Sequence, residues 1–294
     1  ASGCECWNMP ATQPETFGWQ LDYVREGKIL GAYIKQHFPH TKIGFFYQND
    51  EFGQDGVKGL SDEIPASQVV SKQSYDPTNI NILPQVSALK ASGAQLVVSF
   101  SVPAFTALLK LNTLRLNYAA QLAVSNVGAD PITLAGLLQA FAKQGGATVN
   151  GTALTQGIIT DDYVPTVGET SNSWIALFKK IHDTYDPKAP FDGNVLYGEE
   201  VAYTFVQAML KAGRNPTRAS LVSAIEGGLP QGPAVAPYAY SSSDHAGMTG
   251  AFIGVIKNGI EVRQGPVMTT DTSATGPVTQ YTGAEQQAPA SGLP

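Results

Sequence analysis

The alternation of short apolar runs with helical patterns over residues 23–142 is the feature that most constrains the fold. Four runs have the length and composition of β-strands, and they lie at residues 42–47, 68–75, 95–100 and 121–125. Apolar residues at helical spacing separate these runs, and the pattern over residues 68–75 is typical of a strand at a sheet edge. Strands that alternate with helices of about 10–15 residues predict βαβ units, and therefore an α/β fold with a parallel sheet.

The pattern changes after this series. Residues 152–160 predict one more strand, and a loop over residues 161–171 follows. Three helices without an intervening strand come next, and Thr217 is expected to cap the third. Asn258-Gly259 stands between two apolar runs and predicts a β-hairpin. Residues 271–294 are rich in Thr, Gly, Gln, Ala and Pro, which predicts a tail or an irregular surface segment.

Three strand ends indicate where a ligand would bind. Ligands of open parallel sheets lie beyond the carboxyl ends of the strands. Here those ends carry small or polar residues, at residues 48–52, 99–102 and 125–128. We therefore expect this edge of the sheet to face a ligand.

Composition narrows the class of protein. A length of 294 residues suggests about two domains, and a hydrophobic share of 43% is enough to build their cores. The formal charge of −6, with only 18 Lys and Arg, argues against nucleic acid, whose binding needs clustered basic residues. No apolar run in the sequence approaches the ~18 residues that a membrane-spanning helix needs.

The two cysteines, Cys4 and Cys6, leave three alternatives open. They are free thiols, or they form a disulfide with each other, or one of them bonds to a cysteine outside this chain. A disulfide at this spacing requires a backbone bend that brings the two Cα atoms within about 7 Å. The sequence holds no zinc pattern, because there is no second cysteine pair and the histidines are scattered.

Common catalytic and phosphate-binding motifs are missing from the sequence. It lacks G-x-S-x-G, H-E-x-x-H, G-x-G-x-x-G and the P-loop pattern. Residues 49–56 are similar to a calcium loop, but Phe52 stands where a short oxygen ligand is needed. We therefore expect no catalytic residue, no metal and no cofactor.

Two acidic pairs could suggest acid–base chemistry, namely Asp161-Asp162 and Glu199-Glu200. Adjacent residues of a helix point about 100° apart, so Glu199 and Glu200 cannot easily share one proton. A solvated helix start is the expected place for that pair. His245 stands in a polar loop and is expected at the surface.

Several segments, taken in order, resemble the type I periplasmic binding proteins, and above all the branched-chain amino acid receptors of ABC importers. The segments that carry the resemblance lie at residues 14–27, 42–53, 73–80, 91–100 and 197–213. In that family an acid, an aromatic residue and a glycine follow the first strand of lobe 2, as Glu51, Phe52 and Gly53 do here. The resemblance extends over nearly the whole chain up to its C-terminal segment.

The resemblance implies two doubly wound α/β lobes with parallel sheets, joined by a hinge of three crossings. It divides the chain into the end of lobe 1 with the first crossing (1–17), lobe 2 (18–155), lobe 1 helices (156–232), a return to lobe 2 strands (233–270) and a tail (271–294). Family members begin with several βα units of lobe 1 that have no counterpart here, so lobe 1 is incomplete in this chain. We therefore expect a longer N-terminus in the natural protein, and exposed apolar surface on the lobe 1 helices.

Ligand contacts carry over from the resemblance by position. Ser2 and Gly3 match the loop whose small side chains and backbone amides hold a carboxylate. Trp7 would line the cleft or pack within a lobe. Phe52 would stack on the apolar part of the ligand, or cover the end of the sheet. Ser101, with Val102 beside it, follows the next strand.

Asn126 follows the strand after that and departs from the family pattern. Amino-acid-binding members often have an acid there, which pairs with the ligand ammonium. An amide supplies no full charge, and charge-assisted hydrogen bonds are about twice as strong as neutral ones. This departure favours an amide, a hydroxy or keto acid, or an aromatic carboxylate over a free amino acid.

The resemblance implies a periplasmic or extracellular protein that delivers a small organic solute to an ABC importer. The solute would be a branched-chain amino acid or a related amide, carboxylate or aromatic acid. The permease subunits would be its protein partners, with no nucleic acid involved and with membrane contact only by association or through a lipid anchor. A ligand-sensing regulator of the same fold and, after it, a small-molecule hydrolase are the alternatives.

Overall fold

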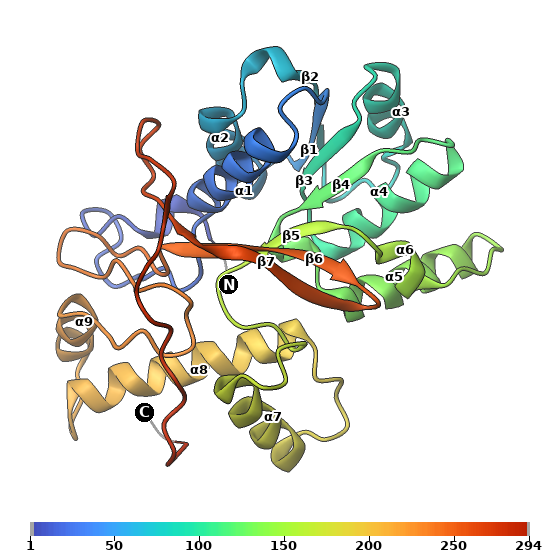
Figure 1. The fold of residues 1–294 in the computed structure, drawn as a ribbon. Coiled ribbons are helices and arrows are strands. Elements are labelled where there is room, and N and C mark those ends of the chain that lie inside the picture. Colours follow the sequence, from blue (N-terminus) through green and yellow to red (C-terminus); the bar gives the residue numbers. More distant parts are fainter. Residues whose placement is uncertain (1–2, 293–294) are drawn as a thin grey trace.

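The computed structural model describes residues 3–292, and in that range it contains one sheet with helices on both faces (Figure 1). The strands lie in the order β2-β1-β3-β4-β5-β6-β7-β8. Their bounds are β1 Ile43–Gln48, β2 Val69–Tyr75, β3 Leu96–Phe100, β4 Gln121–Val124, β5 Ile159–Asp162, β6 Gly250–Lys257, β7 Ile260–Thr269 and β8 Thr279–Gln280. Strands β1 to β5 pair in parallel, and β5 to β8 pair antiparallel. The parallel sheet predicted from the alternation is confirmed, with β2 at its edge.

Consecutive residues of the strands supply two separate cores. Phe45 of β1 packs against the helices of one face, and Phe46 packs against those of the other. The first face carries α1 (Tyr23–His37) and α2 (Glu51–Glu63). The second face carries α3 Leu83–Ala91, α4 Pro103–Arg115, α5 Pro131–Gln144 and α6 Gly151–Thr155. Three 3-10 turns complete this part, at η1 Glu5–Trp7, η2 Ala66–Gln68 and η3 Asn126–Gly128.

Glycines allow α1 and α2 to touch backbone to backbone. A Cβ on Gly27 would lie 2.5 Å from the carbonyl oxygen of Gly56, and one on Gly59 would lie 2.1 Å from that of Val24. No side chain fits at such distances, so these positions require glycine. The contact fixes the start of α1, which contributes to the site described below.

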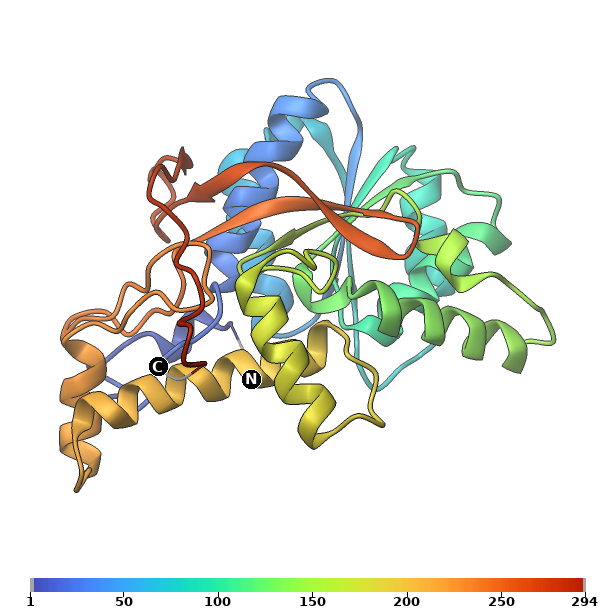
Figure 2. The ribbon, with the colours of Figure 1, turned by 60° about the horizontal axis from the view of Figure 1, so that its bottom comes forward.

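Three helices lie outside the sheet, as the sequence predicts: α7 Ser173–Tyr185, α8 Gly193–Ala212 and α9 Arg218–Glu226 (Figures 1 and 2). Thr217 caps α9 as expected, with its hydroxyl accepting from the backbone N–H of Ser220. Helices α7 and α8 share a small core of their own around Trp174 and Phe178. Elsewhere on α8, Phe205 is 55% exposed and Leu210 is 61% exposed. The expected apolar surface on these helices is therefore present.

Three segments connect the sheet with these helices, at residues 16–22, 162–167 and 234–250. The first and third run together, because Gly18 N–H donates to the His245 carbonyl at 2.9 Å and Met248 N–H to that of Trp19 at 3.1 Å. The third also meets the second, where Val235 N–H donates to the Tyr163 carbonyl at 3.0 Å. The division of the chain into lobes at the boundaries given above stays a prediction.

One strand expectation was wrong in its first half. Residues 152–160 hold the end of α6 and only the start of β5. Asn150 caps α6 by accepting from Ala153 N–H, and Gly157 turns the chain at a φ of 80° before β5. The hairpin at Asn258-Gly259 is confirmed, and both residues have positive φ.

The C-terminal segment is irregular, as expected, but the body of the protein holds it at two places. The fully buried Lys28 ammonium donates to the carbonyls of Asp271, Ser273 and Gly276 at 2.7–2.9 Å. Further along, the Trp174 indole donates to the Gln286 carbonyl at 2.8 Å. Within the described residues, no helix has the length and apolar character to span a bilayer.

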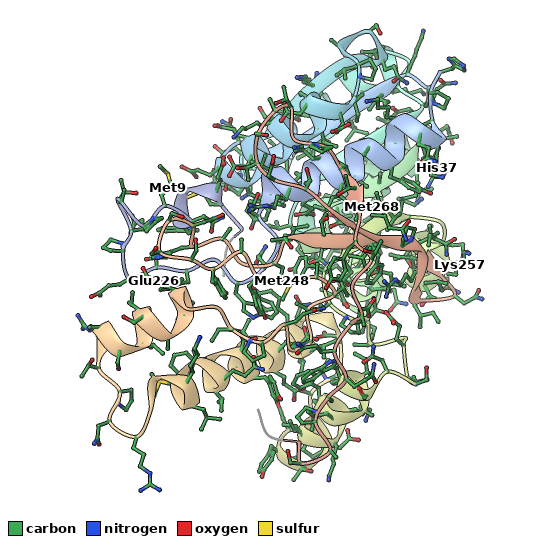
Figure 3. The ribbon with its side chains drawn as sticks, turned by 60° about the vertical axis from the view of Figure 1, so that its left-hand side comes forward. Met9, His37, Glu226, Met248, Lys257 and Met268 are labelled. Carbon is green, nitrogen blue, oxygen red and sulfur yellow. A yellow bond between two sulfur atoms is a disulfide. The ribbon has the colours of Figure 1, made fainter. Side chains whose placement is uncertain are left out.

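Two side chains expected in solvent are buried. His245 has no exposed surface, because its ring stacks on Phe17 and lies between the Thr16 carbonyl and the Glu226 carboxylate, at 2.9 and 3.2 Å. Figure 3 shows Glu226 at the end of α9, and Met248 of the third connecting segment between that helix and the sheet. Glu200 is also fully buried, in the second turn of α8 and not at a solvated start.

Cys4 and Cys6 form a disulfide, with their Cα atoms 5.2 Å apart.

Candidate ligand-binding site

A cavity of about 260 Å³ lies where the sheet, the connecting segments and α8 meet. The first group of its lining residues follows strands β4 and β5: Asn126, Val127, Asp130, Pro131 and residues 162–167. The second group comes from the start of α8: Gly193, Asn194, Leu196 and Tyr197. Gln20, Tyr23 and Glu261 complete the wall. This volume is close to the lower end of the ~300–1,000 Å³ usual for ligand pockets, which suits a small solute.

Asn126 is the residue proposed from sequence that lines this cavity. It opens the short turn η3, which Ser125 caps by accepting from Val127 N–H. The backbone N–H of Asn126 donates to Glu26 Oε1 of α1 at 3.0 Å. The buried carboxyl of Glu26 therefore fixes the backbone of Asn126.

Gly3 and Phe52 lie one layer behind the cavity wall. Gly3 is pressed against two lining residues, since a Cβ on it would lie 2.8 Å from Gln20 Nε2 and 2.9 Å from the Tyr23 ring. Phe52 is 7% exposed and belongs to the core beneath α1. Its ring centre lies 4.6 Å from that of Tyr23, so Tyr23 stands between Phe52 and the cavity.

The other positions proposed from sequence lie away from the cavity wall. Ser101 is fully buried, and its hydroxyl is bonded to those of Ser99 and Thr106 at 2.6 and 2.8 Å. Val102 caps α4 and is partly buried, and Trp7 is 37% exposed in η1. Ser2 lies outside the described residues. Contact of these positions with a ligand stays a prediction.

The two carboxyls of β5 point to opposite faces of the sheet. Asp161 is fully buried beside Glu26 of α1, and neither of its carboxyl oxygens has a hydrogen-bond partner within the described residues. Burial raises the pKa of Glu26 to about 7 and, together with the nearby Glu26 charge, raises that of Asp161 well above its usual value. The pair therefore keeps a proton that two exposed carboxyls would have lost at neutral pH.

Asp162 points to the opposite face and lines the cavity. Burial raises its pKa to about 8, although its Oδ1 accepts from Tyr163 N–H at 3.0 Å. Glu261 of β7 lies on the same wall, and burial followed by the charge of Asp162 raises its pKa well above its usual value. Glu261 was not predicted from the sequence. The one sequence feature that points to it is its place as an acid inside an apolar strand.

The starts of α5 and α8 meet at the edge of the cavity. Asp130 caps α5 through Thr133 N–H at 2.7 Å, and its second oxygen accepts from Gly193 N–H of α8 at 2.9 Å. Asp192 in turn caps α8 through Val195 N–H at 3.0 Å. One carboxylate therefore joins the sheet-packed helix α5 to α8.

Tyrosines provide much of the remaining wall. The Tyr197 hydroxyl donates to Gln20 Oε1 at 2.9 Å, which ties α8 to the first connecting segment. Tyr163 packs edge-on against Trp19 with ring centres 6.3 Å apart. Among the described residues, no group of three or more His, Cys, Asp or Glu side chains is placed to hold a metal ion.

A mixed α/β body, three connecting segments and a partly open cavity at the carboxyl ends of strands fit a receptor for small ligands. Residues 6–260 match the family described as periplasmic binding protein, and the chain belongs to this family, in its type I branch. The family consists of extracytoplasmic solute-binding proteins. No curated protein matches the sequence significantly.

Solved structures of the same fold cover most of the chain. A possible leucine/isoleucine/valine-binding protein from Rhodopirellula baltica is 18% identical with a TM-score of 0.72, over 90% of this chain and 69% of its own. A branched chain amino acid ABC transporter protein from Thermus thermophilus, with bound valine, is 18% identical with a TM-score of 0.69, over 87% and 68%. A solute binding protein of an ABC transporter from R. palustris, in complex with benzoate, is 14% identical with a TM-score of 0.64, over 90% and 66%.

Proposed function

We propose that the protein captures a small organic solute in this cavity and delivers it to an ABC importer. The solute is a branched-chain amino acid or a related amide, carboxylate or aromatic acid. The observation that carries the proposal is the cavity itself, because its wall combines the strand ends of the sheet with the start of α8. The similar proteins with bound valine and with benzoate support a solute of this size.

Binding would stabilise a closed arrangement of two parts of the protein, the sheet with its covering helices and the group of helices α7 to α9. A solute that touches both Asn126 and Tyr197 has contacts that an open arrangement cannot provide, so it shifts the population toward closure. The bond from Gly193 N–H to Asp130 adds a contact between the same two parts. The closed, loaded form is then the one that permease subunits recognise.

The remaining positions keep the roles that the family resemblance suggests. Ser2 and Gly3 would contribute to the first loop of the cleft, while Trp7, Ser101 and Val102 would line its outer part. Phe52 would act through Tyr23, on which it packs. The protein would act in the periplasm or outside the cell, and would contact the membrane through the permease or a lipid anchor.

Native mass spectrometry of the purified protein tests the cavity directly. We expect one small organic molecule per chain, which denaturation releases for identification. Val127→Trp, which fills the cavity from η3, should abolish this adduct. Val206→Trp is the control, because Val206 lies exposed on α8 away from the cavity. An adduct that persists in Val127→Trp would contradict the proposal, and so would equal loss of the adduct in both variants.

Delivery requires a separate test. In proteoliposomes that contain the matching permease and ATPase subunits, the loaded protein should stimulate ATP hydrolysis and solute uptake. The cavity-filled variant should do neither. Tight solute binding without stimulation of any such importer would contradict delivery, and would favour the sensing alternative.

A further inference from the structure

The wall of the cavity carries acids but no base. Asp130, Asp162 and Glu261 line it, and its described lining contains no Lys, Arg or His. A cavity in which acids face no basic residue is suited to a positively charged guest, because the wall itself supplies no opposite charge to these carboxyls.

Among the three acids of this wall, Glu261 is the one with a buried oxygen that lacks a hydrogen-bond partner within the described residues. Its side chain is 8% exposed, and within the described residues its Oε1 has no hydrogen-bond partner. The carboxyl lies over Gly254 of β6, where a Cβ would come within 1.9 Å of Oε1. A strand position without a side chain therefore makes room for this carboxyl beside the cavity.

Asp162 faces the same space from β5. Asp162 is 8% exposed, and its negative charge contributes to the raised pKa of Glu261. The two side chains reach one wall because β6 pairs with both β5 and β7. Two carboxyls from separate strands thus converge on one region.

Helix N-termini are the usual places for a ligand carboxylate, and two of them reach this cavity. Both are already capped by the protein. Asp130 accepts from the N–H groups of Thr133 and Gly193, and Asp192 accepts from that of Val195. The anion sites that these helices could offer are therefore taken by side chains of the chain itself.

We propose that the solute enters this cavity as an organic cation, with its ammonium bound by Glu261 and Asp162. Its apolar part packs against Val127 and Leu196, which lie on the same wall. The inference rests on the proposed function, since it assumes that this cavity holds the solute. It narrows the proposed amides to those that carry an amine, extends the candidate solutes to simple amines, and disfavours free carboxylates.

Binding of the cation is coupled to release of a proton. Burial favours the neutral form of both carboxyls, and the charged groups that face them, Asp130, Glu169 and Glu200, are all acids. A carboxyl that receives an ammonium loses its proton to solvent, while the amine keeps its own. Affinity should therefore rise by up to about tenfold per pH unit between pH 6 and pH 8.

Calorimetric titration with matched probes tests the proposal. The probes share one branched carbon skeleton: 3-methylbutylamine (cation), 3-methylbutanol (neutral), 3-methylbutanoate (anion) and leucine, which adds a carboxylate to the amine. We expect the amine to bind most tightly. Glu261→Gln should weaken its binding by at least about tenfold and reduce the pH dependence. Glu63→Gln is the control, because Glu63 ends α2 and lies outside the cavity wall.

Two results would overturn the inference while leaving the proposed function intact. One is tighter binding of 3-methylbutanoate or leucine than of 3-methylbutylamine. The other is equal loss of amine affinity in Glu261→Gln and Glu63→Gln. If no probe of any charge binds, and native mass spectrometry finds no adduct, the proposed function itself fails. Thermal melting of each variant confirms that it is folded.

Discussion

Asp161 and Asp162 are neighbours in β5, yet their carboxyls meet opposite surroundings. Asp161 points toward α1, where Glu26 lies beside it and accepts from the backbone N–H of Asn126. Asp162 points toward the cavity, and Glu261 stands near it with one oxygen unpartnered by the described residues. Both pairs are buried acids with carboxyl oxygens that lack a hydrogen-bond partner within the described residues, but only the second pair lines the cavity. The comparison suggests that the first pair maintains the structure and that the second awaits a ligand.

The largest expected effect separates the two pairs by stability. Glu26→Ala leaves Asp161 and the Asn126 N–H without their buried partner, and should lower the free energy of unfolding by about 3 kcal/mol. Glu261→Ala removes a buried acid whose Oε1 has no partner among the described residues, and should change the free energy of unfolding by less than about 1 kcal/mol. Urea unfolding measures both. Equal losses in the two variants would remove the distinction.

The pH dependence of stability is the next effect in size. Because burial raises the pKa of Glu26 to about 7, the folded state keeps a proton that the unfolded state loses near its ordinary value of 4.5. Stability should therefore fall as pH rises from about 4.5 to about 7 and then level off, with a loss of about 2 kcal/mol from this group. Urea unfolding from pH 5 to pH 8 measures the slope, and Glu26→Gln should flatten it. A stability that rises through this range would contradict the shared proton.

A smaller effect concerns the space that holds Glu261. Gly254→Ala should push the carboxyl off β6, weaken binding of 3-methylbutylamine by about threefold and cost about 1 kcal/mol of stability. Gly136→Ala is the control, since nothing lies near a Cβ at that position of α5. That control should bind normally and be slightly more stable. Unchanged amine affinity in Gly254→Ala would show that the position of the carboxyl does not matter.

The smallest expected effect is at Asn126. Asn126→Asp adds a fourth acid to the cavity wall while it leaves the backbone bond to Glu26 intact. Preference for 3-methylbutylamine over 3-methylbutanol should rise by about twofold to fourfold, as competition titrations would show. A preference that does not move would mean that this side chain does not face the ammonium.

Local patterns predicted most of the fold, because they depend on neighbours in sequence. The alternation over residues 23–142 predicted the parallel strands, and Asn258-Gly259 predicted the hairpin. The expected strand over residues 152–160 was wrong because Asn150 caps a helical turn through an apolar segment that suits either structure. The burial of His245 was not predictable, since Thr16 and Glu226 reach it from distant parts of the chain.

The candidate site was less predictable than the fold. Asn126 could be placed at the cavity because it follows a parallel strand. Glu261 could not, because it reaches the wall only through the pairing of β5, β6 and β7, which joins residues about a hundred positions apart. Phe52 follows a strand as well, but Tyr23 from α1 comes between it and the cavity. Strand ends indicate the edge that binds, whereas sheet pairing determines which side chains reach it.

The crystal structure of the protein with 3-methylbutylamine tests the central claim most directly. The account predicts the amine inside the cavity, with its nitrogen within hydrogen-bond distance of Glu261 or Asp162 and its methyl groups against Leu196. Only water in a cavity that is otherwise unchanged, with the amine bound elsewhere or not at all, would contradict it.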